Sequence, residues 1–139
     1  MLVNLAESDE QILECFPTIF QLRPHLNKDN FVEQVRRQQK DGYQLAFIKV
    51  DNQVVAVAGF FVSESLAHGK FLYVYDLVVD ENVRSKGYGK HIFDWLLDYA
   101  KSKNCNVFRL DSGVQRFDAH RFYFTQRMKI ASYHFSLSL

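Results

Sequence analysis

The sequence has few cysteines. It contains only two in 139 residues, Cys15 and Cys105, and neither is flanked by residues at metal-ligand spacing. A disulfide-stabilised scaffold or a zinc site normally needs several cysteines, or cysteines combined with histidines, at short intervals. We therefore expect no disulfide framework and no bound metal, and both cysteines should be reduced thiols within the packed protein.

The sequence also lacks the apolar run of about 20 residues that a membrane-spanning helix needs. Its first ten residues, MLVNLAESDE, contain no basic region followed by an apolar one, which is the pattern of a secretory signal. We therefore predict that the protein has no membrane partner and that it is cytoplasmic.

Charge of one sign is not in excess either, because the formal net charge is only +1. Nucleic-acid-binding domains usually have a clear excess of basic residues, so no nucleic-acid partner is expected. The 47% hydrophobic and 24% charged residues are typical of a soluble globular protein. At 139 residues the chain has the length of a single domain, which we predict to span residues 1–139.

The stretch from residue 73 to residue 100 has the strongest local pattern. Residues 71–79, FLYVYDLVV, are apolar except for Asp76, which predicts a strand buried on both faces with one carboxylate inside it. From Ile92 to Ala100 the apolar residues recur at helical spacing, which predicts an amphipathic helix.

A basic turn with two glycines, RSKGYGK at residues 84–90, joins this strand to this helix. The first turn of a helix has backbone NH groups without intrahelical partners and the positive end of the helix dipole, so it attracts phosphate. Gly87 and Gly89 let a phosphate approach the backbone without meeting a β-carbon. Arg84 and Lys86 add positive charge beside those NH groups. The turn therefore predicts a pyrophosphate-binding site.

Two common nucleotide motifs do not fit this turn. The dinucleotide motif G-x-G-x-x-G needs a third glycine where Ile92 stands, and the Walker A motif needs glycine at Arg84 and Ser or Thr at His91. The remaining pattern, R-x-x-G-x-G between a strand and an amphipathic helix, resembles the pyrophosphate loop of the GNAT superfamily of acetyl-CoA-dependent N-acetyltransferases. Arg84, Gly87 and Gly89 occupy its three positions.

The rest of the chain predicts the element order of that fold. We expect a strand at 2–5, helices at about 7–21 and 27–39, hairpin strands at 43–50 and 53–62, the strand and helix described above, a strand at 107–111, a helix at 117–126 and a last strand at 130–139. The resemblance implies an α/β (α+β) fold, the GNAT acyl-CoA N-acyltransferase fold. That fold has a mixed six- to seven-stranded sheet with about four helices and a splayed central strand pair.

A second segment, DAHRFY at residues 118–123, resembles the A-x-x-F-Y stretch of the same family. In that stretch the helix lies against the pantetheine arm of the cofactor and the tyrosine faces the thioester sulfur. The sequence departs from the family nearby, because Arg127-Met128 stands where Gly-Phe is frequent and Ser112 stands where Asn is frequent. The motif positions are Ala119, Phe122 and Tyr123.

The resemblance also implies which residues contact the cofactor. Main-chain groups of the splayed strand would pair with pantetheine, and one of its NH groups would polarise the thioester oxygen. The complete set of implied acetyl-CoA contacts is Leu77, Val78, Val79, Arg84, Ser85, Lys86, Gly87, Tyr88, Gly89, Lys90, Ser112, Ala119, Phe122 and Tyr123.

Two side chains are candidates for the chemistry. An alkylamine is almost fully protonated at neutral pH, so a base must help, and Asp76 in its apolar strand is the first candidate. The alternative for Asp76 is a buried structural acceptor that holds backbone NH groups or an arginine. Tyr123 is the candidate general acid, because a phenol can donate a proton to the departing thiolate.

These observations predict an acyltransferase that moves the acetyl group of acetyl-CoA to a primary amine of a small molecule or peptide by direct attack in a ternary complex. Neither cysteine lies in a motif that supports a covalent intermediate. The alternative is a catalytically inactive acyl-CoA-binding sensor or interaction module with the same fold. The alternating C-terminal segment at 130–139 could also pair across a homodimer.

Overall fold

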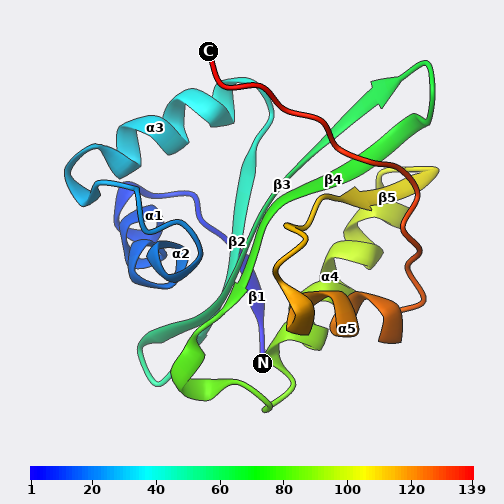
Figure 1. The fold of residues 1–139 in the computed structure, drawn as a ribbon. Coiled ribbons are helices and arrows are strands. Elements are labelled where there is room, and N and C mark those ends of the chain that lie inside the picture. Colours follow the sequence, from blue (N-terminus) through cyan, green and yellow to red (C-terminus); the bar gives the residue numbers. More distant parts are fainter. The chain divides into compact units, whose positions relative to one another are not determined.

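A computed structural model describes all residues from Met1 to Leu139. The chain divides into two compact units, Met1–Arg109 and Leu110–Leu139, which we describe in turn (Figure 1). No helix has the length and apolar character needed to cross a membrane.

The first unit is built on a five-stranded sheet with the strand order β1-β2-β3-β4-β5. The first four strands are antiparallel neighbours. The bounds are Val3–Leu5 for β1, Gln44–Val50 for β2, Gln53–Ser65 for β3, Gly69–Val79 for β4 and Val107–Leu110 for β5.

Strands β4 and β5 start side by side and run in the same direction. The backbone NH of Asn106, just before β5, donates to the carbonyl of Lys70 at 2.7 Å. Further along, the guanidinium of Arg109 lies 4.9 Å from the ring centre of Phe71 and 5.6 Å from that of Tyr73. Because β5 has four residues and β4 has eleven, the second half of β4 extends past β5. This is the arrangement expected of the splayed strand pair.

Helices cover both faces of this sheet (Figure 1). Helices α1, α2 and α3 lie on one face, and α4 lies on the other. The first core contains Ile12, Phe16 and Phe31 from the helices, packed on buried strand residues. On the other face, the ring of Phe60 meets that of Trp95 on α4 edge-on at 5.9 Å. The bounds are Asp9–Glu14 for α1, Phe16–Leu22 for α2, Lys28–Lys40 for α3 and Tyr88–Ser102 for α4, with a 3-10 turn at Glu81–Val83.

The region predicted as one helix at 7–21 forms two helices. Ser8 and Gln11 make a capping box that starts α1 at Asp9, as the polar residues there suggest. Cys15 then ends α1 and precedes α2, and Pro17 lies in the first turn of α2. Proline has no NH group to donate to the carbonyl four residues earlier, so it interrupts one helix and suits the start of the next.

The second unit contains helix α5, Phe117–Thr125, and an extended C-terminal segment. The strand predicted at 130–139 is wrong, because these residues form no strand and make no backbone ladder. Their large side chains are exposed, including Tyr133 at 86% and Phe135 at 90%. Alternation makes a segment suitable for a strand, but a strand forms only where a partner edge accepts its hydrogen bonds. The sheet therefore has five strands rather than six or seven, with five α-helices rather than about four.

Candidate functional site

The start of helix α4 is open. Gly87 is the N-cap residue, its φ of +85° is left-handed, and no side chain caps the helix. Ser85 is also left-handed, with φ +69°. The first intrahelical bond runs from the NH of His91 to the carbonyl of Gly87 at 3.0 Å, so the NH groups of residues 88–90 have no intrahelical partner. The geometry is that of an anion-binding helix start.

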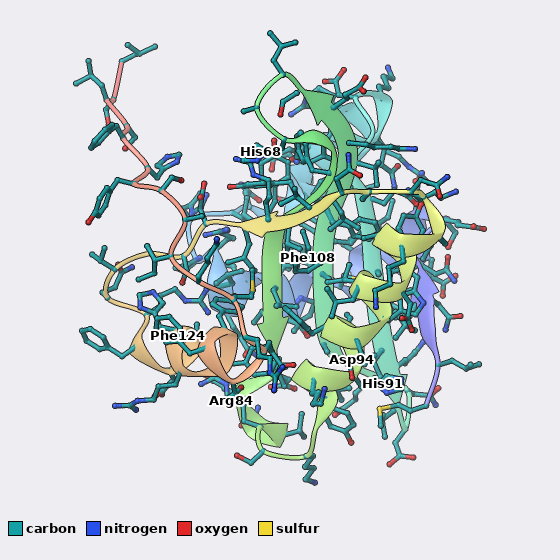
Figure 2. The ribbon with its side chains drawn as sticks, turned by 90° about the vertical axis from the view of Figure 1, so that its right-hand side faces the viewer. His68, Arg84, His91, Asp94, Phe108 and Phe124 are labelled. Carbon is teal, nitrogen blue, oxygen red and sulfur yellow. The ribbon has the colours of Figure 1, made fainter.

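Two basic side chains beside this helix start are unpaired. Arg84 and Lys86 are exposed and make no ion pair. Figure 2 labels Arg84 on the loop before α4. Lys90 is different, because its ammonium group pairs with the carboxylate of Asp94 one turn later at 3.0 Å. The charge available to an anion at this helix start therefore comes from Arg84 and Lys86.

A side chain is unfavourable at each of the two glycines of the turn, for a different structural reason. A β-carbon on Gly87 would meet nothing within 4 Å, so its requirement is the left-handed backbone. A β-carbon on Gly89 would lie 3.3 Å from Cγ2 of Val79, so the helix start packs closely on the end of β4. The predicted loop residues and the predicted strand residues are therefore adjacent.

Strand β4 contains a bulge at its centre. Gly59 of β3 pairs with Asp76, but the next residue, Phe60, pairs with Val74, so Tyr75 is an extra residue on β4. An extra residue bends a strand and redirects its side chains. In this strand it lets Val74 share the face of Phe60 while Asp76 faces α2.

Asp76 accepts hydrogen bonds on both carboxylate oxygens. Nε of Arg23 donates to Oδ1 at 3.1 Å, and the hydroxyl of Tyr43 donates to Oδ2 at 2.8 Å. Nη2 of Arg23 also donates to the carbonyl of Tyr75 at 2.9 Å. Burial, and next the charge of Asp76, raise the pKa of Tyr43 well above its ordinary value, so Tyr43 stays protonated and donates. These contacts agree with the alternative role of Asp76, a structural acceptor that holds an arginine.

Gly59 makes the bond between Tyr43 and Asp76 possible. Tyr43 leads into β2 and Asp76 lies on β4, with β3 between them. A β-carbon on Gly59 would lie 1.8 Å from the Tyr43 hydroxyl oxygen and 2.6 Å from Oδ2 of Asp76. The hydroxyl therefore crosses β3 directly above a residue that has no side chain.

A pocket of about 350 Å³ opens beside this network. We call it the Asp76 pocket. It is lined by α2, α3, the turn between them, Tyr43 just before β2, and two residues of β4. The lining residues are Ile19, Arg23, His25, Leu26, Phe31, Gln34, Val35, Gln38, Tyr43, Tyr75 and Asp76.

The second unit contains the other predicted contacts, Ser112, Ala119, Phe122 and Tyr123. Burial raises the pKa of Tyr123 above its ordinary value, against the opposing charge of Arg116. A phenol with a raised pKa keeps its proton at neutral pH and can donate it. The hydroxyl oxygen of Ser112 is buried and has no hydrogen-bond partner.

Comparison with known proteins agrees with this geometry. The profile of the Acetyltransferase (GNAT) family matches residues 7–128. The protein belongs to the GNAT acetyltransferase family. It is 35% identical over 117 residues to the uncharacterized N-acetyltransferase YhdJ of Bacillus subtilis (strain 168), an alignment that covers 84% of this chain and 82% of that protein.

Solved structures share the GNAT fold. The ribosomal-protein-alanine N-acetyltransferase of Brucella melitensis biovar Abortus 2308 is 17% identical with a TM-score of 0.84, and the match covers 100% of both chains. The glucosamine-6-phosphate N-acetyltransferase of Arabidopsis thaliana is 23% identical with a TM-score of 0.78, and the match covers 99% of this chain and 97% of that chain. At this identity the likeness concerns the fold, which confirms the predicted fold class.

GNAT acetyltransferases generally use acetyl-CoA, and the residues of this GNAT protein fit that cofactor. The NH groups at the start of α4 are uncapped, the nearby Arg84 and Lys86 have no ion-pair partner, and the buried Ser112 hydroxyl lacks a hydrogen-bond partner. Cys15 is unsuited to a covalent step, because burial raises the pKa of its thiol to about 12 and keeps it protonated.

The sequence allows for an arginine beside Asp76, but no local pattern indicates that it is Arg23, or that Tyr43 is the second partner. Arg23 follows the last residue of α2 and Tyr43 follows a Gly-containing turn, and neither position has a motif. Gly59 was the one local signal, because a glycine inside a strand pattern often marks a bulge or a close backbone approach, and this glycine marks both.

We predict that Gly59→Ala destabilises the protein by about 1 to 3 kcal/mol, because the added methyl must displace Tyr43 from Asp76. Urea unfolding measures the change. Gly113→Ala is the matched control, since its added carbon meets only the end of the Gln115 side chain. Equal stability of the two variants would contradict the close approach of the Tyr43 hydroxyl to Gly59.

Proposed function

We propose that this GNAT protein is an N-acetyltransferase that transfers the acetyl group of acetyl-CoA to a primary amine of a small molecule or peptide, by direct attack in a ternary complex. The observation that carries the proposal is the uncapped start of α4 with unpaired Arg84 and Lys86, packed against the end of β4. Acetyl-CoA supplies the activated acetyl group when it is bound.

In this proposal the main-chain groups of Leu77, Val78 and Val79 bind the pantetheine arm. The second half of β4 extends past β5, so its backbone groups on that side lack a ladder with β5. The turn at 84–90 binds the diphosphate through its NH groups and its two free basic side chains. Ser112, Ala119 and Phe122 contribute contacts from the second unit.

The acceptor amine enters the Asp76 pocket in this proposal. The pocket includes Tyr75 and Asp76, which immediately precede Leu77 on β4. The Asp76 side chain remains 16% exposed, so it can take the proton of the amine directly or through a water. Tyr123, kept protonated by its raised pKa, donates a proton to the departing thiolate.

We predict that Lys86→Glu weakens acetyl-CoA binding at least tenfold, which corresponds to the loss of about 1.5 kcal/mol from one charge-assisted contact. Calorimetry with acetyl-CoA measures this. Lys28→Glu makes the same charge change at an exposed position at the start of α3 and should bind as the unmodified protein does. Unchanged affinity in Lys86→Glu would remove the turn from the cofactor site.

Turnover separates the enzyme from an inactive binding module. Release of coenzyme A with a broad panel of amines is the expected result. Acetyl-CoA binding without thiol release from any amine would show that the protein is a binding module.

For Tyr123→Phe we expect kcat to fall about a hundredfold while the KM for acetyl-CoA changes little, because the hydroxyl acts only in the chemical step. The raised pKa keeps Tyr123 protonated up to at least its ordinary value of 10, so the defect should be constant from pH 6 to pH 9. Phe117→Tyr is a control on the same helix. Wild-type turnover in Tyr123→Phe would exclude the acid role.

Asp76→Asn should lower kcat/KM most at low pH, where more of the amine is protonated and a base matters most, by about a hundredfold near pH 6. Tyr43→Phe is the matched control, because it removes one donor to Asp76 and keeps the carboxylate. If the two variants have pH profiles parallel to that of the unmodified protein, Asp76 is a structural acceptor and not the base.

A further inference from the structure

We propose that the acceptor is an α-amino acid with an apolar or aromatic side chain, bound in the Asp76 pocket through both its amine and its carboxylate. The inference rests on the proposed function and names the substrate class of its acceptor site. It follows from the charges of that pocket, the free donors of its guanidinium and the apolar part of its lining.

The pocket contains a single carboxylate. Among its lining residues only Asp76 is acidic, and both of its oxygens already accept hydrogen bonds from Arg23 and Tyr43. Arg23 also balances its charge within the pocket. A polycationic acceptor such as a polyamine or an aminoglycoside needs several unpaired acidic groups to replace the water around its ammonium groups. This pocket does not offer them.

The charged group of the pocket that keeps free hydrogen-bond donors is the guanidinium of Arg23. Arg23 uses Nε toward Asp76 and Nη2 toward the carbonyl of Tyr75, which leaves Nη1 with both of its NH groups. Its side chain is 41% exposed. His25, two residues later, is exposed and makes no hydrogen bond or ion pair with the protein. A guanidinium with free NH groups is suited to a carboxylate.

The guanidinium and the carboxylate of the pocket lie side by side. Nε of Arg23 is 3.1 Å from Oδ1 of Asp76. An α-amino acid has the complementary pair, an ammonium group and a carboxylate on the same carbon. It can therefore place its carboxylate against Arg23 and its amine against Asp76 at once. An amine without a carboxylate satisfies only half of this arrangement.

Part of the lining is apolar, beside the uncharged polar side chains of Gln34 and Gln38. Ile19 comes from α2, Leu26 from the turn after it, and Phe31 and Val35 are buried residues of α3. The exposed ring of Tyr75 adds an aromatic surface at 49% exposure. A cavity of about 350 Å³ is at the small end of ligand sites, which suits one amino acid with a large apolar side chain.

The first test compares matched acceptors in the full chain with acetyl-CoA, by release of coenzyme A. The probes are phenylalanine, phenylalaninamide, phenethylamine, spermidine and a lysine-containing peptide. Phenylalanine should have a kcat/KM at least about tenfold above that of its amide and of phenethylamine. The amide has the less basic amine and is the more reactive nucleophile at neutral pH, so a lower rate with the amide reports recognition of the carboxylate.

The second test removes the proposed carboxylate contact. Arg23→Gln also removes the ion pair of Asp76, so kcat can fall with every acceptor. The readout is therefore a ratio, kcat/KM for phenylalanine divided by kcat/KM for phenethylamine. This ratio should fall about tenfold in Arg23→Gln and be unchanged in Arg37→Gln, which makes the same change on the exposed side of α3. Arg23→Lys should keep part of the preference.

The outcomes separate the two proposals. If no amine releases coenzyme A, the proposed function is wrong and this inference falls with it. If spermidine or the lysine peptide is preferred, or if phenylalaninamide equals phenylalanine, the protein is an acetyltransferase and the amino-acid inference alone is wrong. An unchanged preference in Arg23→Gln would also overturn it.

Discussion

The bonds that Asp76 accepts from Arg23 and Tyr43 hold the centre of this protein together. They tie the end of α2 and the start of β2 to the bulge of β4. A carboxylate in an apolar strand is costly unless both oxygens are satisfied, and here each oxygen has a protein donor. The constraint extends to β3, because the hydroxyl of Tyr43 reaches Asp76 only above Gly59. A single, partly buried carboxylate therefore connects the bulge, the glycine and the arginine.

The same bulge separates two chemical environments along β4. Beyond it, residues 77–79 lead to the α4 start, where uncapped NH groups and unpaired basic side chains suit a diphosphate. At the bulge, Tyr75 and Asp76 line a pocket whose charges are balanced and whose lining combines apolar side chains with uncharged polar ones. In the proposed function, this strand of eleven residues therefore borders a cationic site for the donor and a near-neutral site for the acceptor. Electrostatics favour a different class of ligand at each.

The second unit contains the proposed general acid and proposed cofactor contacts. Its helix α5 has a tyrosine whose proton is retained by burial, and the loop before it has a buried serine hydroxyl without a partner. Buried polar groups in folded proteins are normally satisfied, so an unsatisfied hydroxyl at a position implied to contact the cofactor is consistent with a ligand contact. The exposed aromatic residues after residue 130 show that alternation alone does not produce a strand.

The sequence by itself determined the features that depend on residues close together in the chain, which are the helices, the strands and the glycine-containing turn. Apolar periodicity located the hairpin, β4, α4 and α5, and the R-x-x-G-x-G turn identified the uncapped helix start and its family. Only the tertiary structure decided the surroundings of Asp76, because Arg23 and Tyr43 are 53 and 33 residues away and have no local signal. It also decided that residues 130–139 form no strand, whereas the break between α1 and α2 has a local cause in Pro17. Periodicity reports which face of a segment can be buried, whereas hydrogen-bond partners and pockets arise only when distant segments meet.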